Sequence, residues 1–121
     1  MKRRTLAKVH RSLPPKHHHN VYVVLLDPVV GKLKKANTSN AKRGAKKPCV
    51  YVGMTGLTPE ERFANHKAGV KAASVVKRYG IRLLPDLYAH LNPMPFEAAA
   101  QMEEDLADDL RQAGYTVTGG H

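Results

Sequence analysis

Several features are scarce in this sequence, and each scarcity excludes a class of protein. The chain of 121 residues has one cysteine, Cys49, which excludes an intrachain disulfide and a cysteine zinc cluster. No apolar run approaches the length of a membrane span, and residues 1–16 lack the apolar region of a signal peptide. The sequence therefore predicts a soluble, cytoplasmic protein without a membrane partner, and its length fits one domain.

Acidic residues are scarce in the first half of the chain. Residues 1–56 contain thirteen Lys or Arg and a single acid, Asp27, whereas residues 57–121 contain seven basic and nine acidic residues. The formal net charge of +10 is therefore concentrated in the first half. This asymmetry favours a polyanionic partner, although charge alone does not separate nucleic-acid binding from a solubilising tail.

The N-terminal residues 1–19 predict a flexible basic arm, because they show no sustained apolar period and contain Pro14 and Pro15. The remaining residues, 20–121, form the expected domain. The histidine triplet at 17–19 invites a metal interpretation, but adjacent side chains of an extended segment point in alternating directions, so polar surface is favoured. Cys49 is interpreted as a small buried hydrophobe rather than as a catalytic thiol.

Short runs of β-branched and aliphatic residues predict strands. "VYVVLLD" at 21–27 and "CVYVG" at 49–53 are expected to pair as antiparallel neighbours. Residues 28–47 between them are rich in Gly, Asn, Ser and Lys, which indicates a long basic loop. "IRLLPDLY" at 81–88 contains a third short strand.

Local start and stop signals predict helices between and after these strands. Thr58 as N-cap, Pro59 at the first helical position and Glu61 in a capping box begin one helix, which Gly69 ends. A second helix covers residues 71–80, and a long one begins at residue 96 and ends near Gly114. The predicted fold is therefore a small single α/β domain with a short, mainly antiparallel three-stranded sheet flanked by helices.

The long last helix has an apolar stripe with a carboxylate at its margin. Glu103 lies roughly 60° from the centre of the stripe, and the stripe comprises Ala99, Met102, Leu106, Leu110 and Ala113. One interpretation is a partly covered carboxylate paired with Lys or Arg. The other is a metal ligand, since Mg²⁺ keeps several waters and one protein carboxylate with a substrate phosphate is enough to hold it.

Arg62 and His66 share one face of the first helix, because residues four apart lie one above the other. Such a pair alone is typical of a solvated face. However, Tyr22 and Tyr51 lie on the two strands expected to adjoin this helix. Groups suited to phosphate chemistry thus come from neighbouring elements.

In order and spacing these residues resemble the GIY-YIG nuclease superfamily. The two name motifs correspond to "NVY" at 20–22 and "YVG" at 51–53, and the helical Arg and His to Arg62 and His66. The glutamate of the late helix precedes a leucine by three positions, which selects Glu103 in "MEEDL". Asn20 replaces the first motif glycine, which removes local backbone freedom but no catalytic side chain.

The resemblance implies a metal-dependent endonuclease that hydrolyses phosphodiester bonds, with DNA favoured over RNA. Arg62 would stabilise transition-state charge, and Glu103 would hold one divalent cation, Mg²⁺ in preference to Mn²⁺. Tyr22, Tyr51 and His66 would manage the proton, and the choice of general base among them is open. Two further positions support the site in this interpretation. Gly53 would let the chain turn close to the site, and Thr55 would hydrogen-bond substrate or backbone.

The basic loop would track a nucleic-acid backbone without reading bases. Its candidate contacts are Lys32, Lys34, Lys35, Lys42, Arg43, Lys46 and Lys47. Two other functions compete with the nuclease. One is a non-catalytic nucleic-acid-binding module on the same scaffold, and the other is a protein-interaction domain whose acidic last helix docks a basic partner.

Overall fold

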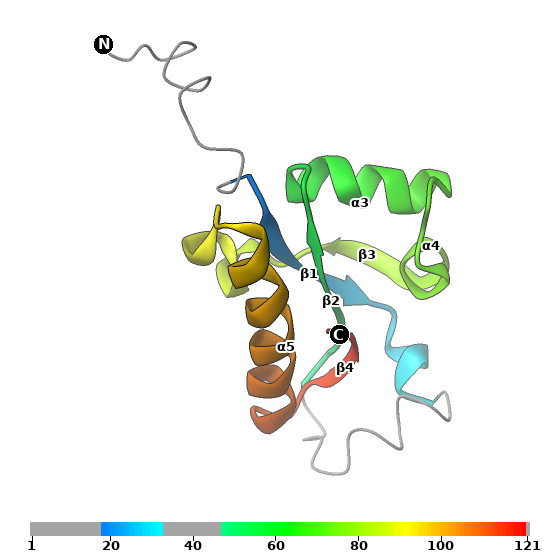
Figure 1. Cartoon of the computed structure of the whole chain (residues 1–121). Coiled ribbons are helices and arrows are strands. Elements are labelled where there is room, and N and C mark those ends of the chain that lie inside the picture. The colour runs from blue at the N-terminus through cyan, green and yellow to red at the C-terminus, as the bar shows by residue number, and fades with distance from the viewer. Residues whose placement is uncertain (1–17, 33–46, 121) are drawn as a thin grey trace, which may run out of the picture.

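The computed structural model describes residues 18–32 and 47–120, which form a mixed sheet with helices packed against it (Figure 1). The described residues form four strands: β1 (Asn20–Leu26), β2 (Cys49–Thr55), β3 (Gly80–Leu83) and β4 (Thr116–Gly119). They lie in the order β3-β1-β2-β4, and β1 is antiparallel to both β2 and β3. The predicted α/β class and the pairing of the first two strands are confirmed.

The predicted three-stranded, mainly antiparallel sheet is wrong, because β4 pairs parallel with β2 and makes the sheet four-stranded and mixed. The sequence of β4 is only "TVTG", too short and too polar to stand out as a strand. Thr116 and Val117 are nonetheless buried. This strand is specified by the free edge of β2 and by the helix before it, and not by a hydrophobic pattern of its own.

Helix α3 (Pro59–Ala68) begins and ends where local chemistry predicted. The Thr58 hydroxyl accepts from the Glu61 N–H at 3.1 Å, and the Glu61 carboxylate accepts from the Thr58 N–H at 3.0 Å. Gly69 ends the helix in the left-handed conformation, with φ of 85°. The expected helix at 71–80 is shorter, α4 (Ser74–Tyr79), because Lys71 has a positive φ and Ala73 is extended.

Helix α5 (Phe96–Gln112) buries a face that is rotated from the predicted stripe. Glu103 and Ala107 are buried, whereas Met102 is half-buried and Ala113 is exposed. The chain after β4 explains the rotation, because Gly120 packs directly against the Ala107 methyl group and lies near the Glu103 carbonyl. Glu103 is therefore 8 % exposed rather than at a solvated margin.

Short 3₁₀ helices complete the described chain: η2 (Pro28–Lys32), η3 (Pro85–Leu87) and η4 (Ala89–Leu91). After η4, the side chain of Asn92 pairs with β1, accepting from the Val21 N–H and donating to the Val21 carbonyl, each at 2.8 Å. Cys49 is buried and unbonded to another cysteine, as expected. Within the described residues no helix has the length and apolar character needed to cross a bilayer.

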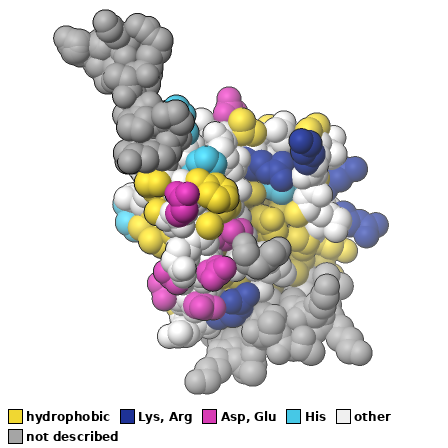
Figure 2. Space-filling view, viewed as in Figure 1, with side chains coloured by type: hydrophobic (Ala, Val, Ile, Leu, Met, Phe, Trp, Pro, Cys, Tyr) yellow, Lys and Arg dark blue, Asp and Glu magenta, His cyan; other side chains and the backbone are white. Residues whose placement is uncertain are grey.

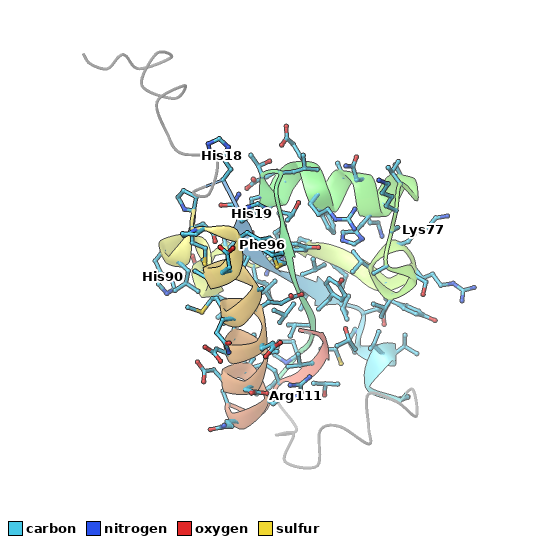
Figure 3. The ribbon with its side chains drawn as sticks, viewed as in Figure 1. His18, His19, Lys77, His90, Phe96 and Arg111 are labelled. Carbon is cyan, nitrogen blue, oxygen red and sulfur yellow. The ribbon has the colours of Figure 1, made fainter. Side chains whose placement is uncertain are left out.

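The two basic segments lie largely outside the described residues. Residues 1–17 of the expected arm and 33–46 of the expected loop are not described. At the boundary of the arm, His19 already pairs with Met94 through two backbone hydrogen bonds of 3.1 and 2.8 Å. The His19 ring also packs edge-on against Phe96, with centroids 5.2 Å apart (Figure 3).

Candidate active site

Strand register places the two candidate tyrosines on one face of the sheet. Tyr22 lies opposite Gly53 and Val24 lies opposite Tyr51, and directly opposed residues of antiparallel strands project to the same side. The Tyr22 and Tyr51 rings have centroids 6.2 Å apart. Tyr22 is fully buried and Tyr51 is half-buried, so the pair reaches from the core toward the surface.

Gly53 allows the Tyr22 phenol to cross over β2. A Cβ at residue 53 would lie 2.6 Å from the Tyr22 hydroxyl oxygen and 2.7 Å from its ring carbon Cζ. The residue lies inside β2 and not at a turn, so the expectation that it bends the chain near the site is replaced by a packing role. The Thr55 hydroxyl accepts from the Leu57 N–H at 3.0 Å just after the strand, so it makes the backbone hydrogen bond that was one of its two expected contacts.

His66 of α3 joins the tyrosines through a buried hydrogen bond. Its Nε2 lies 2.8 Å from the Tyr22 hydroxyl oxygen, and its ring packs edge-on against Tyr51 with centroids 5.7 Å apart. His66 is fully buried although it belongs to a helix with many polar residues. The sequence could suggest a solvated face here, and the structure instead brings His66 into the core beside the phenols.

The direction of the His66–Tyr22 hydrogen bond follows from the other ring nitrogen. The backbone N–H of Ala73 donates to His66 Nδ1 at 3.1 Å, so Nδ1 carries no proton. Burial, with a smaller contribution from the Arg62 charge, lowers the pKa of His66 to about 4, which keeps the ring neutral at pH 7. The neutral ring therefore carries its proton on Nε2 and donates it to Tyr22.

Arg62 lies close enough to affect all three of these side chains, but part of its guanidinium is already engaged. Nη1 donates to the Val70 carbonyl at 3.2 Å and Nη2 donates to the Lys71 carbonyl at 2.8 Å. Arg62 and His66 thus hold the same loop, residues 69–73, from adjacent turns of α3. Arg62 also hydrogen-bonds the Tyr22 side chain, which lowers the pKa of that phenol. An anion would meet the guanidinium hydrogens outside these three contacts.

Glu103 approaches the tyrosines from α5. Burial raises the pKa of Tyr51, and the negative charge of Glu103 raises it further while Arg62 opposes the shift. Burial and the neighbouring Tyr51 raise the pKa of Tyr22, again against Arg62 and with a smaller contribution from Glu103. Both phenols therefore stay protonated at neutral pH in the protein alone.

The residues present fit a divalent cation held by a single carboxylate. The described part of the chain has no group of three or more His, Cys, Asp or Glu side chains arranged to hold a metal ion. Glu103 is a hard oxygen donor beside two phenols, and Mg²⁺ favours oxygen ligands while retaining waters. A multi-ligand metal centre of the zinc type is not formed by these residues.

The expected nucleic-acid contacts in the loop are only partly described. Lys32 is exposed at the end of η2, and the Lys47 ammonium lies 5.3 Å from the centroid of the Tyr115 ring. The other candidates, Lys34, Lys35, Lys42, Arg43 and Lys46, lie outside the described residues.

Two supporting features escape inspection of the sequence. One is the loop 69–73, whose backbone sets the tautomer of His66 and engages Arg62. The other is Gly119, which has φ of 73° and lies where a Cβ would be 2.9 Å from the Tyr51 ring. The sequence feature that indicates the second one is "TGG" at 118–120, since glycines allow the backbone to approach neighbouring groups closely.

Five side chains from four elements thus come together in one candidate site: Tyr22 from β1, Tyr51 from β2, Arg62 and His66 from α3, and Glu103 from α5. In Figure 1, α3 and α5 lie on either side of β2, the strand that contains Tyr51. Compared with known proteins, the chain matches no family model, and no curated protein or solved structure is significantly similar to it.

Proposed function

We propose that this protein is a metal-dependent endonuclease of the GIY-YIG type, hydrolysing phosphodiester bonds in DNA. The observation that carries the proposal is the buried 2.8 Å hydrogen bond between His66 and Tyr22, with Tyr51 packed beside both rings. Arg62 and Glu103 act electrostatically on the same phenols. Phosphodiester hydrolysis needs proton acceptance, neutralisation of phosphoryl charge and help for the leaving oxygen, and this set offers a group for each.

Tyr22 is our assignment for the group that accepts the proton of the attacking water. Because His66 donates to the Tyr22 oxygen, His66 is not the base toward that phenol. The same donated hydrogen bond favours the phenolate form once the Tyr22 proton has left. Tyr51 receives its hydrogen bond from Tyr22 and not from His66, and this bond lowers the pKa of Tyr51 less than the Glu103 charge raises it.

The raised pKa of Tyr22 sets a condition on this assignment. A phenol that is protonated at neutral pH accepts a proton only after losing its own. Arg62 is the positive charge of the protein that lowers the pKa of Tyr22. Substrate binding would therefore have to bring the phenol, Arg62 and the cation into one charge network before the water is activated.

Arg62 would stabilise the charge that grows on the phosphoryl oxygens. Its two bonds to the carbonyls of Val70 and Lys71 fix the guanidinium plane, and a fixed donor loses less freedom when it meets a phosphate. Arg62 thus has a positioning role for the loop 69–73 as well as a role toward substrate.

Glu103 would hold the divalent cation, with Mg²⁺ preferred and Mn²⁺ as the alternative. When bound, such an ion supplies Lewis-acid stabilisation of the phosphate and the leaving oxygen. The carboxylate is held on the buried face of a long helix, so its position is set by packing of α5 against β2 and β4.

The test is relaxation of supercoiled plasmid DNA by the purified protein with Mg²⁺ and with EDTA. We expect cutting with Mg²⁺ only, and loss of cutting in Glu103→Ala. Glu104→Ala is the matched control, since Glu104 is the adjacent, exposed glutamate of the same helix. Undiminished cutting by Glu103→Ala would contradict the metal assignment.

The same purified protein also tests the two competing functions. Retention of DNA without cutting across several divalent metals and substrate shapes would leave a non-catalytic binding module. Failure to bind nucleic acid at low salt would leave a protein-interaction domain.

A further inference from the structure

Charged side chains are segregated to opposite sides of the candidate active site. Residues 62–85, which follow the acidic first turn of α3 (Glu60 and Glu61) and include all of α4 and β3, contain six Lys or Arg and no Asp or Glu. Helix α5 contains six Asp or Glu and one Arg. In Figure 2, Lys and Arg gather over the α3–α4 side of the molecule, and Asp and Glu gather over α5. The site takes residues from both helices and so lies between the two charged regions.

Two of the six basic residues are already used inside the protein. Arg62 holds the loop 69–73, and the Lys67 ammonium donates to the carbonyls of Lys77 and Gly80 at 3.0 and 2.9 Å. Three of the other four side chains are exposed beside this loop, and we call them the basic surface: Lys71, Lys77 and Arg78. The fourth, Arg82, lies opposite Leu25 of β1 and therefore projects to the sheet face away from Tyr22 and Tyr51.

The basic surface is attached to the site through the backbone. Lys71 lies in the loop 69–73. Its carbonyl accepts a hydrogen bond from Arg62, and the Ala73 N–H of the same loop donates to His66. Lys77 extends back over the end of α3, because a Cβ at Gly69 would lie 3.2 Å from its ammonium nitrogen (Figure 3). The bonds from Lys67 hold the end of α4 against α3. These contacts place Lys71 and Lys77 beside the segment that engages Arg62 and His66.

We propose that the phosphate backbone of the bound nucleic acid leaves the site along the basic surface, and that the acidic α5 side faces away from it. The inference rests on the proposed function, and it specifies which side of the site contacts the strand. Positive groups that neutralise phosphates release counterions, whereas the carboxylates of α5 repel the backbone. Such contacts fix orientation and carry no sequence information.

The test is the affinity of the full chain for a labelled DNA duplex of mixed sequence, measured in EDTA at several KCl concentrations. In the variant Lys77→Ala with Arg78→Ala, we expect roughly tenfold weaker binding and a salt slope reduced by about two. The matched control is Ala98→Glu with Gln112→Glu, both exposed on α5, which changes the net charge equally. The control is expected to bind within about twofold of the parent and to keep its slope.

Equal weakening by both variants would overturn the proposal, since net charge alone would then explain binding. Unchanged binding by the Lys77→Ala, Arg78→Ala variant would also overturn it. Thermal unfolding checks that each variant is folded, and Lys71→Gln tests the same surface without altering α4. Binding is measured without a divalent metal, so it is independent of cleavage. A protein that binds DNA through this surface but never cuts plasmid would contradict the proposed nuclease activity and would still support the proposed DNA-binding surface.

Discussion

Tyr22 and Gly53 face each other across β1 and β2, and the phenol of Tyr22 occupies the space that any side chain at residue 53 would need. The nearest phenol atom is the hydroxyl oxygen, 2.6 Å from the position of a Cβ, and this same oxygen accepts from His66. One missing side chain therefore makes room for the central hydrogen bond of the candidate site.

Gly53→Ala is expected to displace the Tyr22 phenol and to lower the free energy of unfolding by about 1–3 kcal/mol, as overpacking does in a close-packed interior. Gly56→Ala is the control, because a Cβ there meets only the His19 ring, at 3.5 Å. Urea unfolding of both variants measures the difference. Equal stability of the two variants would mean that the phenol moves aside without cost.

His66 predicts a specific dependence of stability on pH. Its pKa is lowered from 6.5 to about 4 in the folded protein, so between these values the unfolded chain binds a proton that the folded chain does not. This part of the free energy of unfolding is complete above about pH 6.5, where the ring is neutral in both states, and is lost as the pH falls toward 4. His66→Gln removes the titrating group.

The measurement is the free energy of unfolding of the parent and of His66→Gln from pH 4 to pH 7. The advantage of the parent over the variant should shrink as the pH falls through this window. Parallel curves would show that His66 titrates alike in the folded and unfolded states.

Asn92 stabilises the sheet by taking the place of a strand beside Val21. Asn92→Ala leaves the N–H and C=O groups of a fully buried residue without their partner, and we expect a loss of about 2 kcal/mol. Asn92→Asp keeps the acceptor and loses the donor, so its loss should be intermediate. Asn20→Ala breaks only one exposed hydrogen bond, to Leu57, and should cost least. A different rank order of urea midpoints would refute this role.

The elements that sequence predicts well here are those whose signals are local. The capping box of Thr58 and Glu61 and the left-handed Gly69 fix both ends of α3 by contacts within a few residues. β4 and the burial of Glu103 depend instead on packing between distant segments, since Gly120 covers α5 only after the chain has returned to β2. A helical wheel shows only how residues are arranged around one helix, so it does not predict which face a distant segment will cover.

The candidate site shows the same division. The spacing of Arg62 and His66 predicts that they share a face of α3, but not that both bind the loop 69–73. The tautomer of His66 depends on the backbone N–H of Ala73, and every residue except proline has such a group, so the residue types do not reveal this contact. The sequence therefore predicts which side chains form the site but not that His66 donates the hydrogen bond to Tyr22.

The assignment of Tyr22 as proton acceptor predicts different pH profiles for the two tyrosine variants. The pKa of Tyr22 is raised, so the fraction of phenolate, and with it the cleavage rate of the parent, should increase with pH across the neutral range. Tyr22→Phe should lose roughly 10²–10⁴-fold in rate, the usual contribution of a general base, together with this pH-dependent limb. Tyr51→Phe keeps the hydrogen bond between His66 and Tyr22, so it should retain the limb whatever its absolute rate. Single-turnover cleavage of plasmid DNA between pH 6 and pH 9 measures both profiles. If Tyr51→Phe loses the limb and Tyr22→Phe keeps it, the roles of the two phenols are reversed, and the donated hydrogen bond from His66 serves to hold Tyr22 in place and not to favour its ionised form.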